Sequence, residues 1–134
     1  MTRYLLDTTF LIDYLAGSEG VRAFLDAHDG EEFATTAINY KEVAVGWRLN
    51  DAFDRQELAA TFDWLEVVSF TEDHALTASA FEAELFRDDD PPRRAVDAAG
   101  ADILIAAVAA RDGLTVVTRN LDDFVQFDVP VRAY

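Results

Sequence analysis

Residues 102–118 read DILIAAVAARDGLTVVT, and this stretch decides the fold class. The run Ile103 to Ala110 is apolar on nearly every face of a helix, which is typical of a helix buried on all sides. Gly113 favours the end of a helix, and Leu114 to Thr118 follows it as a short apolar strand. A buried helix that leads directly into a buried strand predicts an α/β fold.

Strands and helices also alternate in the rest of the sequence, where apolar runs are separated by turn signals. The expected elements are a strand at 3–6, helices at 10–15 and 19–27, a strand at 33–35, helices at 37–50 and 54–64, a strand at 65–69, a helix at 71–86, a loop at 88–94, a short helix or turn at 120–127 and a strand at 129–133. No hairpin signal joins the strands. We therefore expect one domain over residues 1–134, a three-layer α/β/α sandwich around a mainly parallel sheet.

The composition is strongly acidic, with 26 Asp and Glu against 11 Lys and Arg and a formal net charge of −15. Asp outnumbers Glu by 17 to 9, and Lys41 is the only lysine beside 10 arginines. Disorder is excluded because 51% of the residues are hydrophobic and regularly spaced. Short, strongly hydrated carboxylates keep a surface soluble where salt screens their repulsion, which predicts adaptation to a salt-rich cytoplasm, as in halophilic archaea.

The sequence also narrows the chemistry and the compartment. It contains no cysteine, which excludes disulfides, a thiol nucleophile and thiolate-bound zinc. The longest apolar run, Ile103 to Ala110, is far shorter than the roughly 20 residues of a membrane span. The N-terminus lacks the apolar stretch of a signal peptide. A cytoplasmic protein without a membrane partner is expected.

Two acidic residues stand at the edges of buried elements. Asp7 follows the first expected strand, and Asp102 leads the apolar helix. Each is equally well explained as a helix N-cap, since Asp is a preferred capping residue. Their places at strand ends favour a functional role, because ligands of parallel sheets collect at the carboxyl ends of the strands.

Glu42 is the third acidic candidate. It interrupts an apolar stripe of Ile38, Val45 and Leu49, so it is expected to face inward toward a cation or hydrogen-bond donors. The alternatives are that it pairs with an arginine or that it reaches the surface at the edge of the stripe. Three carboxylates from separate elements suit a hard divalent cation such as Mg²⁺ or Mn²⁺. Such an ion binds phosphate and lowers the pKa of a water, which points to phosphodiester hydrolysis.

Further polar residues follow the strand that ends at Thr118. Arg119 and Asn120 come next and are able to donate hydrogen bonds to phosphate, although a helix cap with exposed neighbours explains them equally well. His28 and His74 are expected at the surface and receive no role.

Three blocks of sequence are similar to a known family. They are LLDTTFLIDYL at 5–15, TTAINYKEVAVG at 35–46 and ADILIAAVAARDGLTVVTRNLDDF at 101–124. In order and spacing they resemble PIN-domain ribonucleases, specifically VapC-type toxins of type II toxin–antitoxin systems. The resemblance covers nearly the whole chain and implies a PIN-like fold and cleavage of RNA by a water activated by Mg²⁺ or Mn²⁺.

The resemblance also assigns residues. Asp7, Glu42 and Asp102 match the family's first three acidic positions, which are catalytic and hold the metal. Thr9 and Thr118 match hydroxyl positions that flank the site. Asn120 stands at the fourth acidic position, where many members of the family have an acid. Whether Asn120 is a ligand through its amide, or Asp123 takes its place, is open.

The implied partners are RNA, a second copy of the chain in a homodimer, and a small cognate antitoxin that covers the active site. The net charge of −15 repels RNA, so binding is expected to depend on the metal and on shape more than on counterion release. We expect Arg119, and with it Arg93 or Arg94, to line the RNA path.

Other functions fit the sequence less well. A receiver-like signalling domain needs a lysine near its last strand, but Lys41 lies on an early helix beside Glu42. A catalytically inactive PIN-like domain that binds RNA or protein is disfavoured by the three acids and mildly favoured by Asn120. A housekeeping PIN nuclease without an antitoxin stays an alternative.

Overall fold

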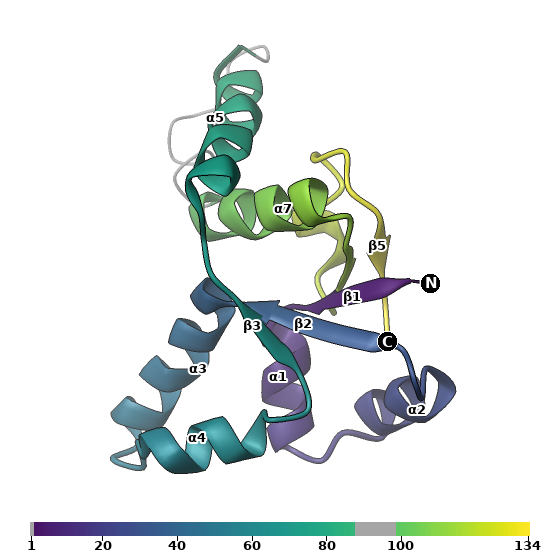
Figure 1. Ribbon diagram of the computed structural model, residues 1–134, viewed down its shortest axis with the longest axis vertical. Coiled ribbons are helices and arrows are strands. Elements are labelled where there is room, and N and C mark those ends of the chain that lie inside the picture. The colour runs from purple at the N-terminus through teal and green to yellow at the C-terminus, as the bar shows by residue number, and fades with distance from the viewer. Residues whose placement is uncertain (1, 88–98) are drawn as a thin grey trace.

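A computed structural model describes residues 2–87 and 99–134 of the chain (Figure 1). The expected loop at 88–94, with Arg93 and Arg94, lies outside the described residues. In the described part, five parallel strands form one sheet in the order β3-β2-β1-β4-β5. They are β1 (Arg3–Leu6), β2 (Glu32–Thr36), β3 (Glu66–Val68), β4 (Thr115–Val117) and β5 (Val131–Arg132).

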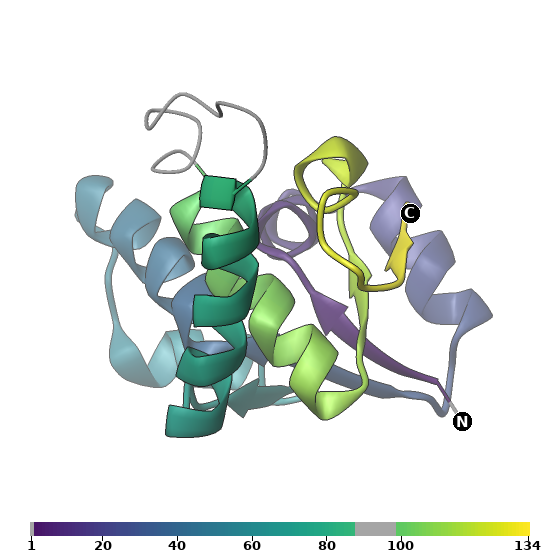
Figure 2. The same cartoon turned by 90° about the horizontal axis from the view of Figure 1, so that it is seen from above.

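Helices cover both faces of this sheet (Figure 1). On one face lie α1 (Thr8–Leu15), α2 (Glu19–Ala27), α3 (Ala37–Leu49) and α4 (Arg55–Thr61). On the other face, α5 (Glu72–Arg87) and α7 (Gly100–Asp112) pack against each other (Figure 2). A short 3-10 helix, η1 (Leu121–Asp123), follows β4. The expected three-layer α/β/α sandwich is therefore confirmed, with a fully parallel sheet among the described strands.

The alternation of side chains along the strands divides the core in two. Leu5 and Val116 face α5 and α7, whereas Tyr4, Leu6 and Val117 face the layer of α1 to α4. Neighbouring residues of a strand point to opposite faces, so a strand covered on both sides must be apolar at every position. This explains why residues 4–6 of β1 and 116–117 of β4 are continuously apolar.

Residues 102–118 form the buried helix and the buried strand that their sequence predicts. In α7, Ile103 and the residues from Ile105 to Ala109 are buried. Gly113 ends the helix in the left-handed conformation, with φ of 70°, and allows the chain to turn into β4. The helix begins at Gly100, two residues before the expected start at Asp102. None of the helices in the described part of the chain combines the length and apolarity needed to cross a bilayer.

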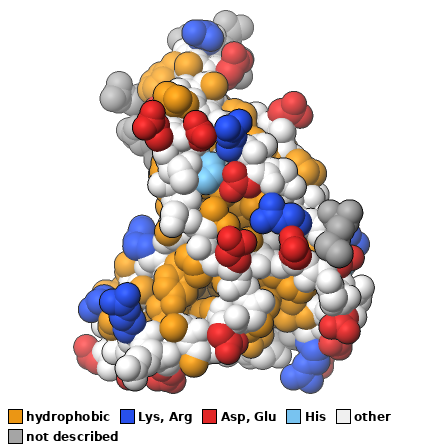
Figure 3. All heavy atoms as spheres, in the orientation of Figure 1, with side chains coloured by type: hydrophobic (Ala, Val, Ile, Leu, Met, Phe, Trp, Pro, Cys, Tyr) orange, Lys and Arg blue, Asp and Glu red, His pale blue; other side chains and the backbone are white. Residues whose placement is uncertain are grey.

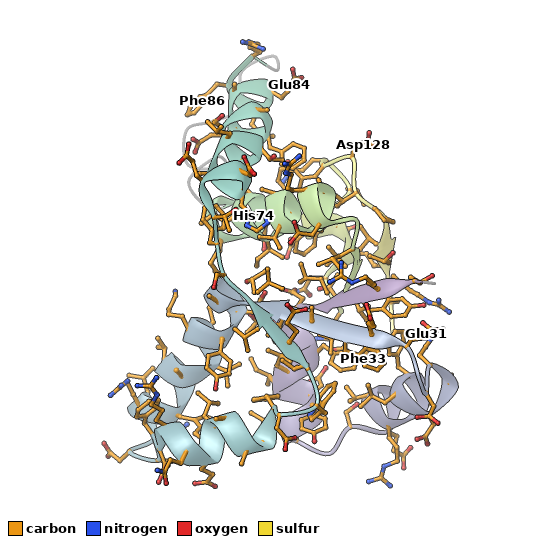
Figure 4. All side chains as sticks on the ribbon, in the orientation of Figure 1. Glu31, Phe33, His74, Glu84, Phe86 and Asp128 are labelled. Atoms are coloured by element: carbon orange, nitrogen blue, oxygen red, sulfur yellow. The ribbon has the colours of Figure 1, made fainter. Side chains whose placement is uncertain are left out.

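The expectation of exposed histidines is wrong for His74, which is 4% exposed. His74 lies at the start of α5, near α7 (Figure 4). Its Nδ1 accepts a hydrogen bond from the Thr71 backbone N–H at 3.0 Å, and its Nε2 lies 3.0 Å from Oδ1 of Asp112. The ring therefore caps α5 and joins it to the end of α7, a tertiary contact that the local sequence does not report.

Candidate active site

The strand order indicates which end of the sheet binds a ligand. The chain runs from β1 outward to β2 and β3, and then returns to β4 and β5 on the other side of β1. The strand order therefore reverses between β1 and β4, and ligands of open α/β sheets bind outside the carboxyl ends of the strands at such a point. Asp7 directly follows β1, and Thr118 directly follows β4.

Asp7 is buried at this point, with 6% of its surface exposed. Its Oδ2 accepts a hydrogen bond from the Thr118 hydroxyl at 2.8 Å, and its Oδ1 accepts one from Nδ2 of Asn39 at 3.1 Å. Asp7 occupies the N-cap position of α1, but its side chain makes no capping hydrogen bond. The capping explanation of Asp7 therefore fails, because the carboxylate is directed across the sheet and not to its own helix.

Burial raises the pKa of Asp7 above its ordinary value, and the nearby charge of Glu42 raises it further. The hydrogen bonds from Thr118 and Asn39 oppose this shift because they stabilise the ionised form. Asp7 is thus a carboxylate held in place by neutral donors, and the described residues give it no cationic partner.

Glu42 lies on α3 and is half-buried. Its Oε1 accepts a hydrogen bond from the Thr8 hydroxyl at 2.9 Å, which brings it beside the start of α1. The expected inward stripe is wrong, because Val45 is 44% and Leu49 80% exposed, and α3 buries Asn39 and Val43 instead. Glu42 therefore reaches the site from the edge of a partly exposed face, and the alternative of an arginine partner is not realised among the described residues.

Asp102 lies in the first turn of α7, whose N-cap is Ala99, so the capping explanation also fails here. Burial raises the pKa of Asp102 to about 7, and the charges of Asp123, Asp7 and Glu42 add to the shift. Asp102 therefore lies near enough to Asp7, Glu42 and Asp123 for their charges to raise its pKa. Among these three charges, that of Asp123 on η1 has the largest effect on the pKa of Asp102. Asn120 is exposed, and its backbone N–H donates to the Thr118 hydroxyl at 3.0 Å.

Two hydroxyls line the site beside Asp7. The Thr9 hydroxyl lies 3.4 Å from that of Thr118 and accepts a hydrogen bond from the Arg119 backbone N–H at 3.1 Å. These contacts tie the start of α1 to the segment after β4. Thr118 contacts Asp7 directly, whereas Thr9 reaches it through Thr118.

Arg119 lies next to this network and is held by α1. Its Nη1 is 3.1 Å from Oδ1 and 3.2 Å from Oδ2 of Asp13, and the Tyr134 hydroxyl donates to Oδ2 of the same carboxylate. Burial and the bond to Asp13 raise the pKa of Tyr134 to about 12. Among the described residues, no acceptor contacts Nε or Nη2 of Arg119, so that edge of the guanidinium remains available to an anion.

Sequence reasoning missed Asn39, Thr8 and Asp13 as parts of this network. The signal for Asn39 was its place three residues after Thr36, the spacing of a capping box. That signal explains the hydrogen bonds of Asn39 to Thr36 but not those to Asp7 and Thr8. Asp13 carried no signal among so many acidic residues.

The donors of the site fit a hard divalent cation. Asp7, Glu42 and Asp102 offer only oxygen, which Mg²⁺ and Mn²⁺ prefer. Within the described residues, no group of three or more His, Cys, Asp or Glu side chains already has the spacing of a metal cage. Mg²⁺ does not need such a cage, because it keeps several waters and is usually held by one or two carboxylates. Burial first, and neighbouring carboxylates second, raise the pKa values of Asp7 and Asp102, and a bound cation would oppose both shifts.

Comparison with known proteins adds the family. Residues 4–130 match the model of the PIN domain family. No curated protein matches the chain. Chains of three solved complexes have the same fold. FitAcB from Neisseria gonorrhoeae is 27% identical over 96% of both chains, with a TM-score of 0.73. VapBC-1 from nontypeable Haemophilus influenzae is 16% identical over 98% of both chains, with a TM-score of 0.78. VapBC2 from Rickettsia felis, bound to a DNA fragment from their promoter, is 17% identical over 99% of both chains, with a TM-score of 0.76.

Proposed function

The chain belongs to the PIN domain family, and on this premise we propose that it is a metal-dependent endoribonuclease that hydrolyses RNA phosphodiester bonds as the toxin of a toxin–antitoxin pair. The observation that supports the proposal is the hydrogen-bonded network that links Asp7 to Glu42 through Asn39 and Thr8 at the point where the strand order reverses, with Asp102 near enough for the charges of both to raise its pKa. Carboxylates that repel one another without a cationic partner are the setting that a divalent cation needs.

The proposed mechanism assigns a task to each side chain. Asp7, Glu42 and Asp102 would hold Mg²⁺ or Mn²⁺, which supplies Lewis acidity toward phosphate and a lowered pKa of water. Thr118 orients the carboxylate of Asp7 by donating to it. Asp123, whose charge raises the pKa of Asp102 more than any other charge does, takes the place of the fourth acid that is missing at Asn120.

Cleavage of RNA is expected to require Mg²⁺ or Mn²⁺ and to stop when EDTA is added, because the three carboxylates carry no positive charge of their own. The measurement follows a labelled single-stranded RNA on a denaturing gel at fixed ionic strength, with excess MgCl₂ added back to restore activity. Cleavage that continues in EDTA would overturn the metal assignment. RNA binding without cleavage in Mg²⁺ and Mn²⁺ would support the inactive PIN-like alternative.

Arg119→Ala is expected to weaken RNA binding by about tenfold, since one charge-assisted contact to a phosphate is worth roughly 1–3 kcal/mol. The salt dependence of binding should also become shallower, by about one unit of slope at most. Titration of a fluorescent RNA at several salt concentrations measures both. Arg48→Ala is the matched control, because Arg48 lies over the Phe53 ring at 3.7 Å, away from the site. Equal affinities of the parent and Arg119→Ala would remove Arg119 from the RNA path.

The proposal extends to two protein partners, a small antitoxin and a second copy of the chain. Support comes from exposed apolar side chains on α1 and α3, which pack against each other; they are Ile12, Leu15, Val45 and Leu49. Figure 3 shows hydrophobic side chains gathered over α3, α4 and β3 on the face in view. Exposed apolar patches of this kind mark interaction surfaces. Sedimentation of the purified chain at the mass of a monomer alone would remove the dimer from the proposal.

A further inference from the structure

We propose that Asn39 is a positioning residue that sets the orientation of two carboxylates, Asp7 and Glu42, which stand on different elements. The inference rests on the proposed function, because it concerns the ligands of the proposed metal. Asn39 lies in the first turn of α3 and is 0% exposed. A fully buried amide must satisfy its donors and acceptors within the protein, so its partners are part of its role.

Both hydrogens of the Asn39 amide are directed into the site. Nδ2 donates to Oδ1 of Asp7 at 3.1 Å and to the Thr8 hydroxyl at 2.9 Å. The Thr8 hydroxyl in turn donates to Oε1 of Glu42 at 2.9 Å. Asn39 therefore holds Asp7 directly and Glu42 through Thr8, although 32 residues separate it from Asp7 in the chain.

The contacts of Oδ1 of Asn39 determine where its Nδ2 hydrogens point. Oδ1 of Asn39 accepts from the Thr36 backbone N–H at 3.3 Å and from the Thr36 hydroxyl at 2.7 Å. A reversed amide would set its NH₂ group against the backbone N–H and its oxygen against the Asp7 carboxylate. Only one orientation satisfies every group. The capping box of α3 thus aims the two donors at the acidic site.

The neutrality of Asn39 suits a site that binds a cation. A lysine or arginine here would hold the carboxylates equally firmly but would neutralise the charge that attracts the metal. An amide donates without adding charge. Each oxygen of Asp7 accepts one side-chain hydrogen bond, and an ionised carboxylate has about four acceptor positions, so acceptor capacity remains for a metal.

The test measures Mn²⁺ binding by isothermal titration calorimetry without RNA. Asn39→Ala should weaken Mn²⁺ binding by about 10- to 100-fold, the usual cost of removing a group that orients a metal ligand. Ser18→Ala is the matched control, since it removes the N-cap of α2 and leaves Asn39 and all of its partners in place. Both variants should lower the unfolding temperature, but Ser18→Ala should bind Mn²⁺ within about threefold of the parent, because the lost cap affects α2 and not the ligands.

Two more variants keep the test decisive. Thr8→Val removes the bond to Glu42 but not the one from Asn39 to Asp7, so it should weaken Mn²⁺ binding less than Asn39→Ala. If Asn39→Ala does not fold, Asn39→Ser replaces it, because one hydroxyl hydrogen cannot serve both Asp7 and Thr8. Parental Mn²⁺ affinity in the folded Asn39 variant, or equal losses in it and in Ser18→Ala, would overturn the inference alone. A parent protein that binds no Mn²⁺ would overturn the proposed metal site and this inference together.

Discussion

Asp7→Asn and Asp102→Asn are each expected to lower divalent-dependent RNA cleavage by on the order of a thousandfold, because several kcal/mol of charge stabilisation depend on these carboxylates. Each replacement keeps the size of the side chain and removes its charge. Both carboxyls lie in environments that raise their pKa values, so a neutral amide is tolerated there and the variants should remain folded.

The measurement compares initial rates of RNA cleavage in Mg²⁺ with circular dichroism spectra of the same preparations. Asp73→Asn is the matched control, since Asp73 lies on α5 with its side chain 65% exposed and contacts Arg111. This control should retain parental activity. Parental rates in folded Asp7→Asn and Asp102→Asn would show that these carboxylates are not the metal ligands of the reaction.

Without divalent cations, the free energy of unfolding is expected to fall between about pH 4 and pH 7 because of Asp102. The folded protein raises the pKa of this carboxyl from 3.8 to about 7, so unfolding releases its proton within this range. A rise in pH then favours the unfolded state, and the stabilisation present below pH 4 is lost above pH 7. The contribution is on the order of 1–2 kcal/mol, since Asp102 is only partly buried and solvent reduces the effect.

Thermal unfolding of the parent and Asp102→Asn in EDTA, at constant ionic strength from pH 4 to pH 8, isolates this carboxyl from the other acids. The parent should lose stability relative to Asp102→Asn as the pH rises. Excess Mg²⁺ should restore the parent at pH 7 and above, because a ligand that binds only the folded state stabilises it, and should change Asp102→Asn less. Parallel pH profiles for the two proteins in EDTA would contradict the assignment.

The sequence alone was sufficient for the architecture. The fully apolar run from Ile103 to Ala110, the terminating Gly113 and the strand after it predict a helix and a strand that are buried on all sides. Burial of this kind is typical of sheets that helices cover on both faces, so the local pattern predicts the three-layer fold. The position of Asp7 directly after the first strand was likewise predictable from the sequence, because the end of a strand depends on local residues.

The tertiary structure decided how the site is held together. The stripe that singled out Glu42 is largely exposed, and the buried polar residue of that helix is Asn39. Sequence periodicity reports neighbours three and four residues apart, whereas the hydrogen bonds of Asp7 join it to residues 32 and 111 positions away. Such contacts depend on which strands lie side by side and on which donors the crossing elements present. The sequence therefore determined the strands, the helices and the acids at strand ends, whereas only the folded chain determined the strand order and which neutral side chains contact those acids.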